Sequence, residues 1–150
     1  GVIYFQNDQS VYLTPSANTL TLTGNFVASG TISGSMPTVV DGAASPYSIS
    51  VAQAKAGTFF LNTLAGTKVY NLPAAEPGMA VCVKNGQGVA QILRVDGDGT
   101  DYIVKSTGAR TTVAGDYYGA TADAKNQICL VTFDATDWYV TSEVGTWTEE

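Results

Sequence analysis

The sequence contains no histidine. This absence excludes Ser-His-Asp and Cys-His catalysis, a histidine general base and every zinc site with an imidazole ligand. Its two cysteines, Cys82 and Cys129, are too few for a four-cysteine metal site or a framework of several disulfides. No apolar run approaches the roughly 18 residues of a membrane-spanning helix, so we expect no insertion into a membrane.

Charge is also scarce, because only 13% of the 150 residues are charged, about half the usual share in a soluble domain. The net charge of −6 and the isoelectric point near 4.3 argue against nucleic acid or an anionic membrane as a partner. Ten of the 13 carboxylates lie between Asp96 and Glu150, whereas no charged side chain lies between Gln9 and Val40. The chain starts at Gly1 rather than at Met, so we expect a processed product or a fragment of a longer protein.

The uncharged N-terminal segment carries a strand signal, because Leu20 and Leu22 alternate with threonines. Its pieces between glycines are too short to bury enough apolar area alone. We therefore expect several copies to wrap together, as a homotrimer with Leu20, Leu22, Phe26 and Ile32 in one axial core. A flexible Ser/Thr/Gly linker is the alternative.

The next segment, from Met36 to Pro46, has the composition of a linker. Ser50 and Gln53 then fit a capping box, and Gly57 suits the end of a helix of one to two turns. This is the only helix signal in the sequence. We predict two parts, an extended attachment or shaft-like segment over residues 1–45 and a β-rich knob over residues 46–150.

Short strand-like runs and turns alternate through the rest of the chain, at intervals of about ten residues. Asn85-Gly86 between two such runs is a strong hairpin signal. The pattern predicts an all-β knob, an antiparallel sandwich or barrel with one short helix. The expected strands are Thr58–Leu64, Lys68–Leu72, Met79–Lys84, Val89–Val95, Tyr102–Lys105, Arg110–Val113, Asn126–Phe133, Trp138–Thr141 and Gly145–Trp147.

Three carboxylates, Asp96, Asp98 and Asp101, crowd one glycine-rich loop. A solvated turn is the favoured interpretation, because Asp and Gly both suit turn geometry. A calcium site and a glycosidase carboxylate pair are the alternatives, although the spacing is not that of an EF-hand. No phosphate-binding glycine motif occurs. We expect no resident metal, no cofactor and no enzymatic activity.

Each cysteine lies inside an apolar run, as Val-Cys-Val and as Ile-Cys-Leu. We expect both thiols to be reduced and structural, and a bridge between them is the alternative. The C-terminal third also holds five aromatic residues that suit a core or a sugar-stacking surface. The core is favoured for Trp138, and the choice is open for Tyr117 and Tyr118.

Three segments resemble bacteriophage virion proteins. Val69–Asn85 is similar to a V-x-L-P-A-A-x-P-G-M segment, ending in Asn, of tail-fibre and head-decoration proteins. Ile92–Ile103 resembles the strand, acidic glycine loop and D-x-I segment that follows it in those proteins, and Cys129–Trp147 resembles their ending in G-T-W. The threonine-rich N-terminal segment also looks like a shaft that leads into a fibre knob. The resemblance implies a trimeric, β-rich virion protein without fixed catalytic residues.

We therefore expect a non-enzymatic structural protein located in the virion. A tail-fibre or receptor-binding module is the first hypothesis, with other virion proteins and a host surface glycan as partners. A capsid decoration protein that stabilises the head is the alternative, and a carbohydrate-binding or glycan-cleaving module of a cell-surface enzyme is a third. The expected contact residues lie in three C-terminal loops and are Asp96, Asp98, Asp101, Asp116, Tyr117, Tyr118, Asp134 and Asp137.

Overall fold

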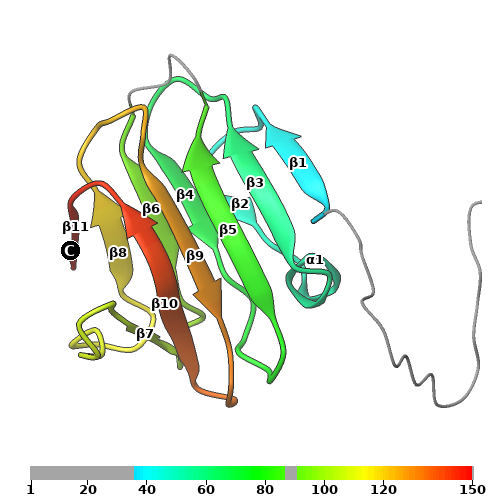
Figure 1. Cartoon of the computed structure of the whole chain (residues 1–150), viewed down its shortest axis with the longest axis vertical. Helices are drawn as coiled ribbons and strands as arrows, with labels where there is room; N and C mark the ends of the chain where they lie inside the picture. Colours follow the sequence, from blue (N-terminus) through cyan, green and yellow to red (C-terminus); the bar gives the residue numbers. More distant parts are fainter. Residues whose placement is uncertain (1–35, 87–90, 150) are drawn as a thin grey trace, which may run out of the picture. The chain divides into compact units, whose positions relative to one another are not determined.

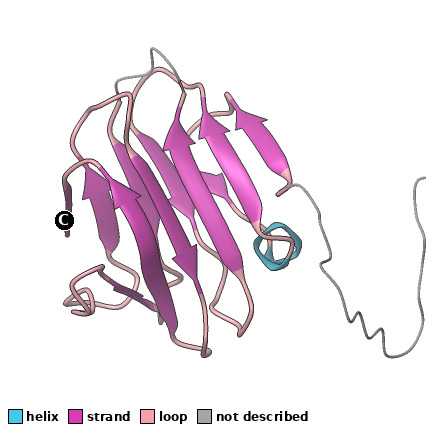
Figure 2. Cartoon of the chain, viewed as in Figure 1, coloured by secondary structure: helices cyan, strands magenta, loops and turns pink. Residues whose placement is uncertain are grey.

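The computed structural model describes residues 36–86 and 91–149, and strands dominate this part of the chain (Figure 2). The described residues belong to one compact unit, Ser35–Glu150. The expected trimer core of Leu20, Leu22, Phe26 and Ile32 lies outside the described residues. The all-β prediction is confirmed for the part described.

Two sheets pack face to face, and Figure 1 shows the larger one in front. The six-stranded sheet has the order β1 (Thr38–Asp41), β3 (Thr58–Asn62), β5 (Ala80–Asn85), β9 (Gln127–Val131), β10 (Asp137–Val144) and β7 (Tyr102–Val104). The five-stranded sheet has the order β11 (Trp147–Glu149), β8 (Tyr117–Ala120), β6 (Leu93–Asp96), β4 (Lys68–Asn71) and β2 (Tyr47–Ser48). Neither sheet closes on itself, so the barrel alternative is wrong.

The first six strands alternate between the two sheets, which makes neighbours within each sheet parallel. Thr38 therefore lies beside Phe59, and Phe59 beside Cys82, in the larger sheet. Tyr47 and Tyr70 are matching partners in the smaller sheet. The antiparallel prediction is wrong for this half, because a chain that crosses between layers after every strand returns in the same direction. Strands β8, β9, β10 and β11 do form antiparallel pairs, so both sheets are mixed.

Two local predictions in the parallel half are also wrong. Residues 38–41 are not a linker, since they form β1 and pair with β3. Asn85-Gly86 does not make a hairpin, because β5 and β6 belong to different sheets. The Asn85 side chain is buried instead, donating to the carbonyl of Gln91 at 2.7 Å and that of Asp123 at 2.8 Å.

The ends of three parallel strands carry a polar ladder, which consists of Asp41, Asn62 and Asn85 in register. Asn62 Nδ2 donates to Asn85 Oδ1 at 2.9 Å. The side chains of Asp41 and Asn62 each accept the backbone N–H two residues further on, from Ala43 and Leu64 respectively. The repeated Asx turn ends β1 and β3 in the same way, and in each case the chain continues into the other sheet.

The predicted helix is confirmed as α1 (Val51–Lys55). Ser50 is its N-cap, and the capping box with Gln53 is complete. Gly57 follows the helix with a φ of +69°, a conformation that glycine adopts without a steric penalty. Gln53 also donates to the Tyr47 hydroxyl at 2.9 Å, which ties the helix to β2.

The core between the sheets comes from alternate residues of the strands, as the period of two requires. Trp138 has no exposed surface, which confirms the prediction that it fills the core. Phe60 and Tyr70 pack with Tyr47 in a cluster of rings whose centroids lie 5.5–5.9 Å apart. The remaining large buried side chains include Met79, Leu93, Ile103, Ile128 and Leu130.

The cysteine prediction is wrong, because Cys82 and Cys129 form a disulfide. The two residues are register partners on the neighbouring strands β5 and β9, with their Cα atoms 4.1 Å apart. Antiparallel pairing therefore brings together two positions that are 47 residues apart in the sequence.

Candidate functional site

Two of the predicted contact loops meet at one end of the sandwich. Strand β6 ends at Asp96 directly opposite Tyr117, the first residue of β8. Gly115 N donates to the carbonyl of Asp101 at 2.8 Å, which joins the loop before β8 to the acidic loop. The acidic loop and the approach to β8 thus form one surface.

The three carboxylates of the acidic loop differ in burial, with Asp96 half-buried, Asp98 exposed and Asp101 buried. Asp101 is buried, and its Oδ2 accepts the backbone N–H of Ala75 at 2.6 Å. Burial raises its pKa, while the hydrogen bond from Ala75 opposes that rise. Burial also raises the pKa of Asp96, with the carboxylates of Asp116 and Asp98 adding to the effect. Within the described residues no three acidic or cysteine side chains converge on a metal position.

The two neighbouring tyrosines of β8 have opposite environments. Tyr117 is 39% exposed, and the Arg94 guanidinium carbon lies 5.8 Å from its ring centroid. Tyr118 is only 4% exposed and belongs to the core, so its inclusion among the expected contact residues is wrong. Its ring packs 5.6 Å from that of Trp147, and its hydroxyl donates to Glu143 at 3.1 Å. Alternation along the strand places adjacent side chains on opposite faces.

The turn before β10 presents a second group of aromatic and acidic side chains. Asp134 Oδ1 accepts the backbone N–H groups of Thr136 and Asp137. The Tyr139 hydroxyl donates to Asp134 Oδ2 at 2.8 Å, which raises the pKa of Tyr139 to about 12. Phe133 is 71% exposed and packs 5.3 Å from the Tyr139 ring. Asp137 itself is buried and paired with Arg110, so it is not a surface contact.

Sequence reasoning missed Phe133 as a surface residue, because the run from Asn126 to Phe133 was expected to be one strand. Strand β9 ends at Val131, two residues earlier. An apolar residue directly before an Asp turn was the available signal. The predicted strand over Arg110–Val113 is reduced to one bridge between Arg110 and Val104, which leaves this arginine at the surface beside Asp137.

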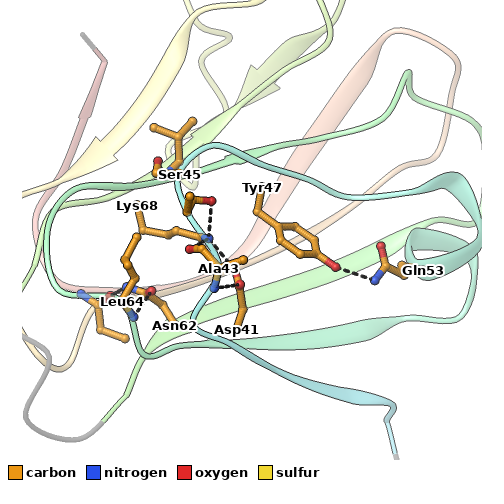
Figure 3. Close-up of polar contacts among 11 residues, drawn as sticks. Asp41, Ala43, Ser45, Tyr47, Gln53, Asn62, Leu64 and Lys68 are labelled. Atoms are coloured by element: carbon orange, nitrogen blue, oxygen red, sulfur yellow. Dashed lines mark hydrogen bonds and ion pairs between the residues drawn. The ribbon is translucent and has the colours of Figure 1, made fainter.

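A second polar centre lies between β1 and β4 (Figure 3), and nothing in the sequence pattern pointed to it. Lys68 and Asp41 both have buried side chains, with Nζ and Oδ2 2.7 Å apart. Lys68 Nζ also donates to the carbonyl oxygens of Ala43 at 2.9 Å and Ala44 at 3.3 Å. Asp41 is the last residue of the polar ladder, because β1 is the edge strand of its sheet among the described strands, and Lys68 pairs with it there.

The comparisons with known proteins identify no family for the chain. No family model matches it, and a search of curated proteins finds no match. No helix in the described part of the chain is long and apolar enough to cross a membrane.

Proposed function

We propose that the protein is a non-enzymatic structural component of a bacteriophage particle that contacts a host surface glycan. The proposed contact surface comprises Phe133, Asp134 and Tyr139 at the turn before β10, together with Tyr117 at the start of β8. The observation that carries the proposal is the 71% exposed ring of Phe133, which packs against the half-buried Tyr139 beside a hydrogen-bonded carboxylate. Sugar rings stack on aromatic faces, and their hydroxyl groups bond to carboxylates.

The organisation of the chain supports a role in assembly. Residues 1–35 hold one charged side chain, Asp8, and suit association with copies of the chain or with other virion proteins. We therefore keep the homotrimer as part of the proposal, with Leu20, Leu22, Phe26 and Ile32 as its core. Sedimentation of the full chain as a stable monomer at micromolar concentration would overturn the trimer.

Capsid decoration is the second candidate, and the free edge of β1 favours it. Within the described strands β1 pairs on one side only, with β3. Val40 is 67% exposed and Met36 48% exposed beside that edge. Exposed edges accept a further strand from another protein.

A crossed pair of variants separates the two candidates. Phe133→Ala removes the most exposed ring of the contact surface, and Val40→Ala removes a side chain of similar exposure from β1. The host-contact proposal expects Phe133→Ala to weaken binding of the purified protein to host cells about tenfold, the scale of an aromatic anchor. Val40→Ala is expected to leave that binding unchanged.

The opposite pattern supports decoration. Unchanged host binding by Phe133→Ala, together with weaker binding of Val40→Ala to phage heads, would reject the host-contact proposal. Both variants are expected to fold, because neither side chain belongs to the buried core. Thermal unfolding of each variant checks this condition.

A further inference from the structure

The Lys68–Asp41 pair is more deeply buried than the pairs Lys55–Glu76, Lys105–Glu149 and Arg110–Asp137, of which the last has a buried carboxylate but an exposed arginine. The Lys68 and Asp41 side chains are 0% and 1% exposed. The pair between Lys55 and Glu76 is 52% and 49% exposed, and the pair between Lys105 and Glu149 is 23% and 19% exposed. Removing two charges from water costs several kcal/mol per ion. The site therefore favours any reaction that replaces the two charges by a neutral group.

Both partners are held in place by one short stretch of chain. Asp41 Oδ1 accepts the N–H of Ala43 at 2.9 Å, which leaves Oδ2 towards the lysine. The carbonyls of Ala43 and Ala44 accept hydrogen bonds from Lys68 Nζ and fix the position of the amine. The carboxyl carbon Cγ of Asp41 is bonded to Oδ2, so Cγ lies no more than about 4 Å from Lys68 Nζ. Because the fold holds the amine and the carboxyl group together, a reaction between them is intramolecular, and their effective concentration is high.

Two tyrosine rings lie beside the amine of the pair. The Tyr47 and Tyr70 ring centroids each lie 5.3 Å from Lys68 Nζ. The Tyr70 hydroxyl is buried, and burial together with the Asp41 carboxylate raises its pKa. The hydroxyl therefore keeps its proton and remains a donor beside the carboxyl group.

We propose that Lys68 and Asp41 condense into an intramolecular amide that cross-links β4 to the end of β1. A proton first moves from Nζ to the carboxylate, which leaves a neutral amine and a neutral acid. The Nζ lone pair then forms a bond to Cγ, and one Cγ–O bond breaks. That oxygen leaves as water with its own hydrogen and one from the amine. No oxidant, reductant or further reactant is needed.

The mass of the intact protein tests the proposal, measured after reduction of the disulfide. The expected mass is about 18 Da below the sequence mass, the mass of one water molecule. Proteolysis is expected to release one branched peptide in which Lys68 is joined to Asp41. A measured mass equal to the sequence mass overturns the proposal, and this test needs no variant.

Another route to the same mass loss must be distinguished, because Asp41 precedes Gly42 and an Asp-Gly sequence can form a cyclic imide. An imide regains water in mildly alkaline buffer and yields linear peptides, whereas the amide persists and yields the branched peptide. Loss of the mass difference at alkaline pH, with linear peptides only, overturns the proposal.

Two variants and a control locate the bond. Lys68→Arg keeps the charge but removes the nucleophilic amine, and Asp41→Ala removes the acid, so both are expected to have their full sequence mass. Lys55→Arg alters the exposed pair with Glu76 and is expected to retain the loss of one water. Retention of the water loss in Lys68→Arg would overturn the assignment.

Discussion

At the scale of single residues, the buried polar groups are satisfied mainly by one another and by the backbone. Asp101 accepts from Ala75, and Asn85 donates to two carbonyls. Composition gave no sign of this, because carboxylates and amides beside glycine look like solvated turns. The same residue types also occur in buried turns. Only the hydrogen-bond partner, which lies far away in the sequence, distinguishes a buried turn from a solvated one.

Replacement of Lys68 tests the buried pair through stability. Lys68→Met leaves the Asp41 carboxylate buried and unpaired, whether the wild type holds the ion pair or the proposed amide, so we expect a loss of about 3–5 kcal/mol in the free energy of unfolding. Lys55→Met, at the exposed pair with Glu76, is expected to cost less than about 1 kcal/mol. Denaturant unfolding of both variants measures the difference. Equal losses would contradict the importance assigned to burial.

The pH dependence of stability isolates Glu149. The Lys105 ammonium and the Thr112 N–H lower the pKa of Glu149 from 4.5 to about 2. A lowered pKa in the folded state stabilises the protein above pH 4.5, and this contribution disappears as the pH falls towards 2. The stability difference between the wild type and Glu149→Gln is therefore expected to shrink over that window. A pH-independent difference in urea unfolding would contradict the ion pair.

At the scale of secondary-structure elements, local sequence signals predicted the helix and several strand positions, because local interactions determine these features. The helix follows from Ser50, Gln53 and Gly57, which act within one turn of chain. Several strand positions follow from alternation, because each strand has one buried face. The pairing of the strands could not be predicted from alternation. Strand β3 pairs with β5, although the chain forms β4 in the other sheet between them. Asn85-Gly86 does not form the predicted hairpin, because the Asn85 side chain is buried in the polar ladder.

The link between β5 and β9 gives a prediction at the same scale. Titration of the denatured, unreduced protein is expected to find no free thiol, because Cys82 and Cys129 are joined. The double variant Cys82→Ser with Cys129→Ser is expected to lose about 2–4 kcal/mol of unfolding free energy, since the bridge closes a long loop. Two free thiols per chain would contradict the bridge.

At the scale of the whole molecule, the candidate site was predicted in part. Sequence reasoning grouped the acidic loop with the approach to β8, and these two segments do meet in the structure. It could not separate exposed from buried members, so it included Tyr118 and Asp137 and missed Phe133. Burial depends on which strands lie opposite each loop, and those partners are distant in the sequence.

The position of the protein on the phage particle tests the central proposal most directly. Antibodies against the folded part, detected by gold labelling in electron microscopy, locate the chain without relying on any variant. A host-contact module is expected to be labelled at the far ends of the tail fibres. Label confined to the head surface would contradict host contact in favour of decoration, and purified particles without any label would contradict a virion protein altogether.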